Sequence, residues 1–221
     1  MNKCAPRVTG RPDFPSADQL RLIIFDCDGV LFDSREANVA FYDAILAAEG
    51  LPPLDEEGRR LCYALSGTQL YARLFSADPE LHRRVSARAK LVDYGPFYPL
   101  MIPVDGLRDT LARLSAHCPL AMATNRGRTV DGVVEHFEIA RFFAARLGVL
   151  DVARPKPAPD LLLTCLERLS VTAEAAVYVG DSDLDRRAAE AASIAYIGIG
   201  SESGARVVVE GIRELPDLLL G

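Results

Sequence analysis

Short runs that are apolar at every position recur along this chain, separated by longer segments with helical spacing. The first run, Leu22–Phe25, passes directly into the acidic stretch 26–28. A strand without polar alternation is buried on both faces, which is typical of a parallel sheet. Further runs predict strands at 119–123, 145–147, 176–179 and 194–197, with a short edge strand at 207–209. Strands that alternate with helices predict the α/β class with a Rossmann-like parallel sheet core.

Apolar residues at i, i+3, i+4 and i+7 predict amphipathic helices between these strands. The segments 130–137 and 160–169 follow this spacing, and Asp105 is the expected N-cap of a further helix. The apolar residues of these helices are assigned to the core and not to a cofactor site.

The segment 35–98 breaks the alternation, because it contains helical patterns and no convincing strand. Gly50 and the Pro52-Pro53 pair end its first helix, and Asp78 caps its last. The predicted organisation is an N-terminal extension at 1–19 that frays from the fold, an α/β core at 20–34 and 99–221, and an inserted all-helical domain at 35–98.

The composition narrows the function classes. The chain has 221 residues and a formal net charge of −6, which does not favour a nucleic-acid partner. The apolar runs are too short to cross a bilayer, and the first 19 residues lack the apolar core of a secretory signal. Five scattered cysteines without a CxxC pair favour buried free thiols in a reducing cytoplasm.

Polar clusters follow the predicted strands at their carboxyl ends, where ligands bind in an open parallel sheet. In the first cluster, Asp26 and Asp28 are two residues apart, and Gly29 permits a tight turn. One carboxylate is suited to nucleophilic attack and the other to proton transfer. A capped turn with solvated acids is an equally good interpretation of this cluster alone.

Two clusters supply groups that bind an oxyanion. Thr124 and Asn125 follow the second predicted strand with a hydroxyl and an amide, and Arg126 adds a positive charge, although a solvent-facing arginine is the simpler interpretation. Lys156 stands between two prolines that restrict its backbone, and it is suited to pair with both a phosphate and a carboxylate. An exposed proline-rich connection is the alternative for the Lys156 segment.

The last cluster is acidic. Asp181 is expected to meet Asp26 across the sheet and to share one Mg²⁺, which prefers carboxylate oxygens. Asp185, one helical turn later, is expected to bind this metal through water or to orient its ligands. Acid enrichment at a helix N-terminus is the competing interpretation.

The order of these four clusters resembles that of the haloacid dehalogenase-like (HAD) superfamily. The resemblance extends over about residues 22–209 and includes the inserted helices, which correspond to the C1 cap of that superfamily. The motifs are most similar to those of the phosphoglycolate phosphatase-like and β-phosphoglucomutase-like branch. They are Asp26-Cys27-Asp28-Gly29-Val30, Thr124-Asn125, Lys156-Pro157 and Gly180-Asp181-Ser182 with Asp185.

This resemblance implies a Mg²⁺-dependent phosphatase that forms an aspartyl-phosphate from a small phosphomonoester. Asp26 is the implied nucleophile and Asp28 the acid/base, with Thr124, Asn125 and Lys156 on the phosphoryl group. Asp26, the Asp28 backbone, Asp181 and Asp185 are the implied metal site. Less specifically, the resemblance assigns substrate contacts to Ser66, Gly67 and Thr68 in the cap, and Arg126 is a further candidate substrate contact from its position and charge.

Three alternatives remain open at this stage. Haloacid dehalogenation is disfavoured, because the metal-independent dehalogenases lack the second aspartate of the first motif. A phosphosugar mutase shares the cap and motifs, and a non-catalytic phosphometabolite sensor shares the fold. A sensor is expected to lose one of the four central residues, and this chain keeps them all: Asp26, Asp28, Lys156 and Asp181. The sequence does not indicate an oligomer, so a monomer is the default expectation.

Overall fold

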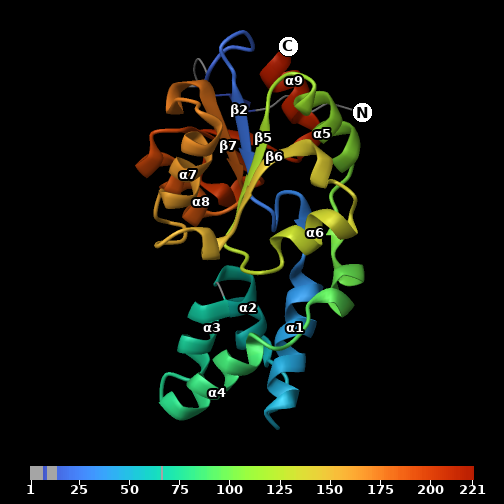
Figure 1. Ribbon diagram of the computed structural model, residues 1–221, viewed down its shortest axis with the longest axis vertical. Helices are drawn as coiled ribbons and strands as arrows, with labels where there is room; N and C mark the ends of the chain where they lie inside the picture. Colours follow the sequence, from blue (N-terminus) through green and yellow to red (C-terminus); the bar gives the residue numbers. More distant parts are fainter. Residues whose placement is uncertain (1–6, 9–13, 66) are drawn as a thin grey trace. The chain divides into compact units, whose positions relative to one another are not determined.

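The computed structural model describes residues 7–8, 14–65 and 67–221. The chain forms two compact units, one of Met1–Phe32 with Pro103–Gly221 and the other of Asp33–Ile102. The first unit contains a large sheet covered by helices, and the second is built of helices (Figure 1). The predicted fold class, a Rossmann-like parallel sheet with an inserted all-helical segment, is confirmed.

The large sheet has the strand order β1-β9-β8-β7-β2-β5-β6, and all its strands except β1 pair in parallel. Each predicted strand is present, with ends shifted by up to two residues. Burial at every position of β2 and β5 explains their continuous apolar sequence. The parallel strands are β2 Leu22–Phe25, β5 Leu120–Ala123, β6 Phe143–Leu147, β7 Ala176–Gly180, β8 Ala195–Ile199 and β9 Val207–Val209.

The N-terminal segment differs from the expected frayed extension. Its residues Arg7–Val8 form β1, which pairs antiparallel with Val207 and Val208 of β9. Consequently β9 is not the edge strand that the sequence predicts, because β1 covers its outer side. Two residues carry no periodicity, so the sequence pattern does not reveal this strand.

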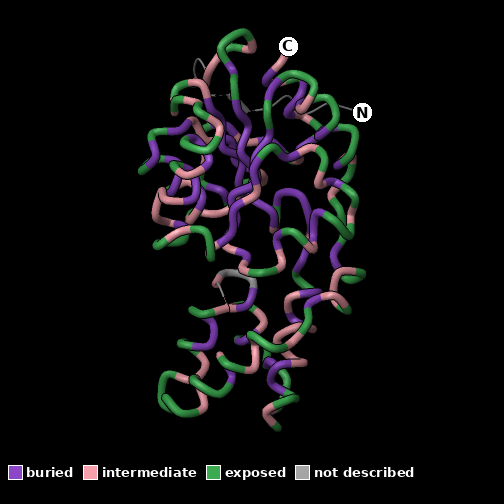
Figure 2. The backbone as a smooth tube through the Cα atoms, in the orientation of Figure 1, coloured by how far each residue is buried: buried purple, intermediate pink, exposed green. Residues whose placement is uncertain are grey.

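Helices cover both faces of the sheet (Figure 1). On one face, α7 and α8 pack against the central strands around Leu162, Cys165 and Ala189. Gly106, with φ +72°, is the N-cap of α5, and not Asp105 as predicted. The buried residues line the strands and the inner helix faces in Figure 2. The helices are α5 Leu107–Ser115, α6 Val130–His136, α7 Asp160–Leu169, α8 Asp183–Ala192 and α9 Leu215–Leu220.

The helical unit has its own core. Asp55 and Asp78 cap two of its helices, each accepting a backbone N–H three residues on. Its interior is formed by Ile45, Leu70 and Val85, which are fully buried. Its helices are α1 Arg35–Ala48, α2 Glu56–Ala64, α3 Gly67–Leu74 and α4 Pro79–Ala89.

Short elements complete the chain. Two-residue strands, β3 Phe32–Asp33 and β4 Ile102–Pro103, pair where the chain leaves and re-enters the sheet unit. The 3-10 helices are η1 Gly95–Leu100, η2 Ala140–Phe142, η3 Val149–Asp151, η4 Ala173–Ala175, η5 Ser201–Ser203 and η6 Ile212–Glu214.

Within the described part of the chain, no helix is both long and apolar enough to cross a membrane. Cys4 lies outside the described residues. The other four cysteines are free and buried, as the sequence predicts: Cys27, Cys62, Cys118 and Cys165.

Candidate active site

Three adjacent strands bring three of the sequence clusters together. Strand β2 lies between β7 and β5, and Phe25 is level with Val179 on one side and Met122 on the other. The residues that follow therefore emerge side by side at the carboxyl edge of the sheet. Asp26 follows β2, Asp181 follows β7 and Thr124 follows β5.

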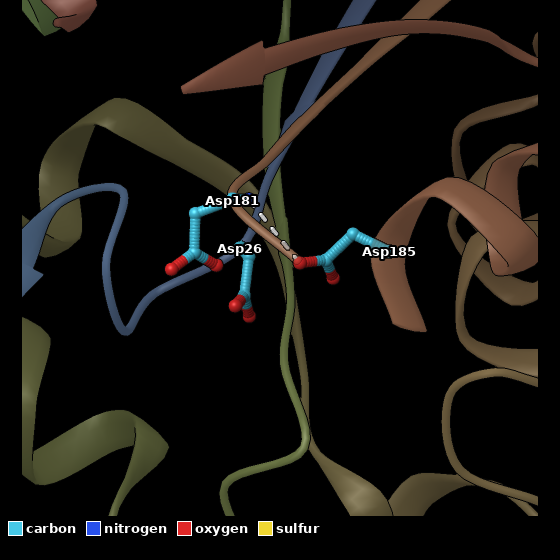
Figure 3. A group of neighbouring side chains, drawn as sticks. All are labelled: Asp26, Asp181 and Asp185. Carbon is cyan, nitrogen blue, oxygen red and sulfur yellow. Dashed lines mark hydrogen bonds between the residues drawn. The ribbon is translucent and has the colours of Figure 1, made fainter. Parts of the chain in front are cut away.

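Asp26, Asp181 and Asp185 each offer a carboxylate oxygen within 4.8 Å of the others. In Figure 3, the carboxylates of Asp26 and Asp181 point in the same direction, and that of Asp185 approaches them from α8. Asp26 and Asp185 are buried, and Asp181 is half-buried. These three residues form the carboxylate cluster of the site.

Burial disfavours the charged forms of two of these carboxylates. It raises the pKa of Asp26 to about 6, an effect that Lys156 opposes and Asp185 adds to. Burial also raises the pKa of Asp181 to about 8, together with the negative charges of Asp26 and Asp185. The cluster therefore favours a proton or a cation between Asp26 and Asp181.

Asp185 is held differently, because hydrogen-bond donors surround its carboxylate. Oδ1 accepts from Lys156 Nζ at 2.6 Å and from Tyr178 at 2.6 Å. Oδ2 accepts from the Ser182 hydroxyl and backbone N–H in a capping box at the start of α8. Burial alone would raise the pKa of Asp185, but Lys156, Ser182 and Tyr178 outweigh burial and lower it. Of the two predicted roles, this geometry favours orienting its neighbours.

Lys156 lies between two members of the carboxylate cluster, Asp26 and Asp185. Its Nζ lies 2.8 Å from Asp26 Oδ1 and 2.6 Å from Asp185 Oδ1. Burial would lower the pKa of Lys156, but the two carboxylates outweigh burial and raise it, so the ammonium stays charged. Lys156 thus places a buried positive charge beside Asp26.

Asn125, from the second sequence cluster, hydrogen-bonds to the backbone of Lys156. The Asn125 amide donates to the Lys156 carbonyl at 3.1 Å and accepts the Lys156 N–H at 2.9 Å. Asn125 therefore fixes the loop that carries the lysine, whereas the resemblance implies a phosphoryl contact. The buried Thr124 hydroxyl accepts the Arg126 N–H at 3.2 Å and keeps its own proton to donate.

Gly29 shapes the turn between the two aspartates of the first motif. Its φ is +77°, and a Cβ atom there would lie 1.8 Å from Asp181 Oδ2. Only glycine satisfies both conditions, because other residues disfavour this backbone region and need space for Cβ. This close approach places Asp181 against the first motif.

The Arg126 side chain forms an ion pair with the Asp28 carboxylate, whereas the sequence predicts a substrate contact or a solvent-facing side chain. Its guanidinium donates to both oxygens of the Asp28 carboxylate at 2.6–3.0 Å. The Arg126 side chain is 6% exposed and that of Asp28 32%. The arginine is thus a buried partner of the predicted acid/base.

The remaining predicted residues lie in the helical unit. Gly67 and Thr68 begin α3, and Ser66 lies outside the described residues. Their assignment to substrate binding stays a prediction.

Sequence reasoning misses Tyr178. It is fully buried in β7, and its hydroxyl donates to Asp185 and accepts from Lys156 at 2.9 Å. A tyrosine inside an apolar run is indistinguishable by pattern from a core residue. Ser182 carries a weak sequence signal, since Ser-x-x-Asp resembles a capping box.

The carboxylate cluster has the ligand chemistry that a Mg²⁺ ion needs. Among the described residues, no hydrogen-bond donor is aligned on the buried Oδ1 of Asp26, because the Lys156 ammonium is within ion-pair distance but outside hydrogen-bond geometry. Carboxylate oxygens from Asp26 and Asp181 are ligands that Mg²⁺ prefers. A cation beside them would offset the negative charge that raises their pKa values.

The fold and the carboxylate cluster define a class of hydrolases that use aspartates at the carboxyl edge of a parallel sheet. Residues 23–199 match the family described as haloacid dehalogenase-like hydrolase. The chain belongs to this family. Within the family it is a phosphoric monoester hydrolase of the HAD type.

Relatives of known name and structure agree with this assignment. A phosphoglycolate phosphatase of Pseudomonas putida is 32% identical over 81% of this chain and 69% of its own length. One from Chromobacterium violaceum is 31% identical over 90% of this chain and 96% of its own length. A HAD-superfamily hydrolase of subfamily IA from Geobacter sulfurreducens is 34% identical, with a TM-score of 0.76 over 95% of this chain and all of that one.

Proposed function

We propose that the protein is a Mg²⁺-dependent phosphatase that hydrolyses a small phosphomonoester through an aspartyl-phosphate on Asp26. The observation that carries this proposal is the buried contact of 2.8 Å between Asp26 and Lys156, beside the Asp181 carboxylate. A carboxylate held next to a fixed positive charge is suited to receive a phosphoryl group.

In the proposed reaction, a carboxylate oxygen of Asp26 attacks the phosphorus in line with the leaving oxygen. The P–O bond to the alcohol breaks while a new bond forms to Asp26. Asp28 gives its proton to the leaving alkoxide and then takes one from the water that hydrolyses the aspartyl-phosphate. Lys156 and the Thr124 hydroxyl stabilise the charge on the transferring group.

Asp26, Asp181 and the Asp28 backbone carbonyl would hold the Mg²⁺. When bound, the ion supplies positive charge that offsets the repulsion between the carboxylates and a phosphate dianion. Asp185 serves this site by fixing Lys156 and the turn at Ser182.

The names of the two bacterial relatives support a phosphoglycolate-like substrate, and a sugar phosphate is the second substrate class of the proposal. Four buried free thiols are consistent with the proposed cytoplasmic location. The segment 35–98 is proposed to act as the cap, and Thr68→Ala tests whether its loop affects substrate preference.

The test measures phosphate release from a panel of small phosphomonoesters with Mg²⁺ and with EDTA, for the wild type and Asp26→Asn. The proposal expects release that requires Mg²⁺ and falls by at least about 10⁴-fold in the variant. Asp131→Asn, which alters a carboxylate that pairs with Arg146 on the protein surface, is the matched control and should keep full activity.

Near-full activity in Asp26→Asn would exclude the nucleophile assignment. A folded wild type that binds Mg²⁺ but releases no phosphate from any ester would exclude the phosphatase proposal. Isomerisation of a phosphohexose would then identify a mutase, and its absence a sensor.

A further inference from the structure

We infer that Arg126 is the positioning residue for the acid/base Asp28. This inference rests on the proposed function, since it concerns the proton that Asp28 delivers. The observation that carries it is that the Arg126 guanidinium hydrogen-bonds to both carboxylate oxygens of Asp28, a residue 98 positions earlier in the chain.

The geometry of the pair fixes the direction of the carboxylate. Arg126 Nε lies 3.0 Å from Asp28 Oδ1 and 2.8 Å from Oδ2, and Nη2 lies 2.6 Å from Oδ1. A planar guanidinium that contacts both oxygens restrains the rotation of the carboxylate as well as its position. One contact point, as lysine would offer, restrains the position only.

Arg126 is itself held from several sides. Its Nη1 donates to the Thr129 hydroxyl at 3.3 Å, and its carbonyl accepts the Val149 N–H at 2.9 Å. Its backbone N–H donates to Thr124. The chain passes close by at Gly148, where a Cβ atom would lie 2.5 Å from the Arg126 carbonyl oxygen. The backbone of Arg126 is thus held in place, and its guanidinium is buried and hydrogen-bonded to Thr129, whereas Asp28 is the more exposed end of the pair.

This arrangement matters for leaving groups that must be protonated. An alkoxide leaves poorly unless Asp28 donates a proton to its oxygen as the P–O bond breaks, whereas an acidic phenol leaves as the phenolate without this proton. General acid catalysis contributes about 10²–10⁴-fold when the donor is well placed. Loss of Asp28 placement should therefore reduce the hydrolysis of alkyl phosphates selectively.

The experiment compares kcat/KM for glycerol 3-phosphate and p-nitrophenyl phosphate at saturating Mg²⁺, because kcat/KM includes the first chemical step. Arg126→Gln is expected to lose about 100-fold on the alkyl ester and less than about 5-fold on the aryl ester. Arg126→Lys should fall between Arg126→Gln and the wild type. Adding Arg126→Gln to Asp28→Asn should cause no further selective loss, since both changes remove one function.

Arg146→Gln is the matched control, because Arg146 pairs with Asp131 outside the site and should leave both esters unaffected. Equal losses on the two esters, or a higher KM alone, would show that Arg126 binds the phosphate, and would overturn the inference. A gain in activity would show that Arg126 restrains Asp28 unproductively, and would also overturn it.

A crystal structure of Arg126→Gln separates this inference from the proposed function, since it needs no turnover. Asp28 in its wild-type rotamer would overturn the inference even if the enzyme is active. A displaced Asp28 supports the positioning role even if the wild type hydrolyses none of the esters, which would refute the proposed function alone.

Discussion

The Tyr178 hydroxyl donates a hydrogen bond of 2.6 Å to the Asp185 carboxylate, and both side chains are fully buried. The same hydroxyl accepts from Lys156, so it satisfies one buried donor and one buried acceptor. Leaving buried charged groups short of a hydrogen bond costs more than the bond itself contributes.

Tyr178→Phe is therefore expected to lower stability by about 1.5–3 kcal/mol and kcat/KM by roughly tenfold, because Lys156 loses one of its anchors. Tyr196→Phe is the matched control, since its hydroxyl donates to an uncharged acceptor, the Ser182 carbonyl, at 3.3 Å. Chemical denaturation and steady-state kinetics check both variants. Equal behaviour of the two would mean that the Tyr178 hydroxyl does not support Lys156.

Asn125→Ala is expected to act through the Lys156 loop. The two lost hydrogen bonds contribute about 1 kcal/mol each, so the melting temperature should fall by about 4–8 °C and kcat by at least about tenfold. Thr124→Val loses one hydrogen bond, the one from the Arg126 N–H, so its melting temperature should fall by only about 2–4 °C, while inhibition by inorganic phosphate weakens. The reverse pattern would assign the phosphate contact to Asn125.

Mg²⁺ should stabilise the protein more at pH 8 than at pH 6. The raised pKa values of Asp26 and Asp181 mean that their stabilising contribution is present below about pH 4 and is lost as pH rises through about 6 to 8. A cation replaces the lost protons, and at a hundredfold excess over Kd it adds about 2.7 kcal/mol. Thermal melts with Mg²⁺ and EDTA at both pH values check this, and a larger shift at pH 6 would contradict it.

Alanine substitutions at two glycines with positive φ, Gly29 and Gly50, distinguish the effect of backbone strain from the effect of a clash in the site. Gly29→Ala and Gly50→Ala both force alanine into the left-handed region, at a cost of about 1–2 kcal/mol. Only Gly29→Ala also drives a Cβ atom against Asp181, whereas Gly50 faces open space. We expect Gly50→Ala to keep full activity and Gly29→Ala to lose stabilisation by Mg²⁺. Retained Mg²⁺ stabilisation in Gly29→Ala would contradict the close approach.

The strands and the placement of the motifs were predictable because both depend on local pattern. Continuous apolar runs identify β2 and β5, and parallel strands bring the residues that follow them to one edge. The carboxylate of Asp181 therefore lies beside that of Asp26 as expected.

The contacts that tune the site were not predictable from local pattern. The partner of Asp28 is 98 residues away, and its charge gives no indication of whether it faces solvent or a carboxylate. Tyr178 has the sequence environment of a core residue, and the two residues of β1 are too few to show a period. Only the packing of distant segments reveals these roles.

The parallel register of β7, β2 and β5 also limits how such a chain can change in evolution. A one-residue insertion within β2 would turn Asp26 to the opposite face, because successive strand residues alternate in direction. Between β3 and β4 the chain leaves and returns at neighbouring points, so insertions or deletions within Asp33–Ile102 leave this register intact. Mutations that alter length are thus tolerated in one segment and selected against in the other, so the helical segment can diverge while the arrangement of the carboxylates is inherited.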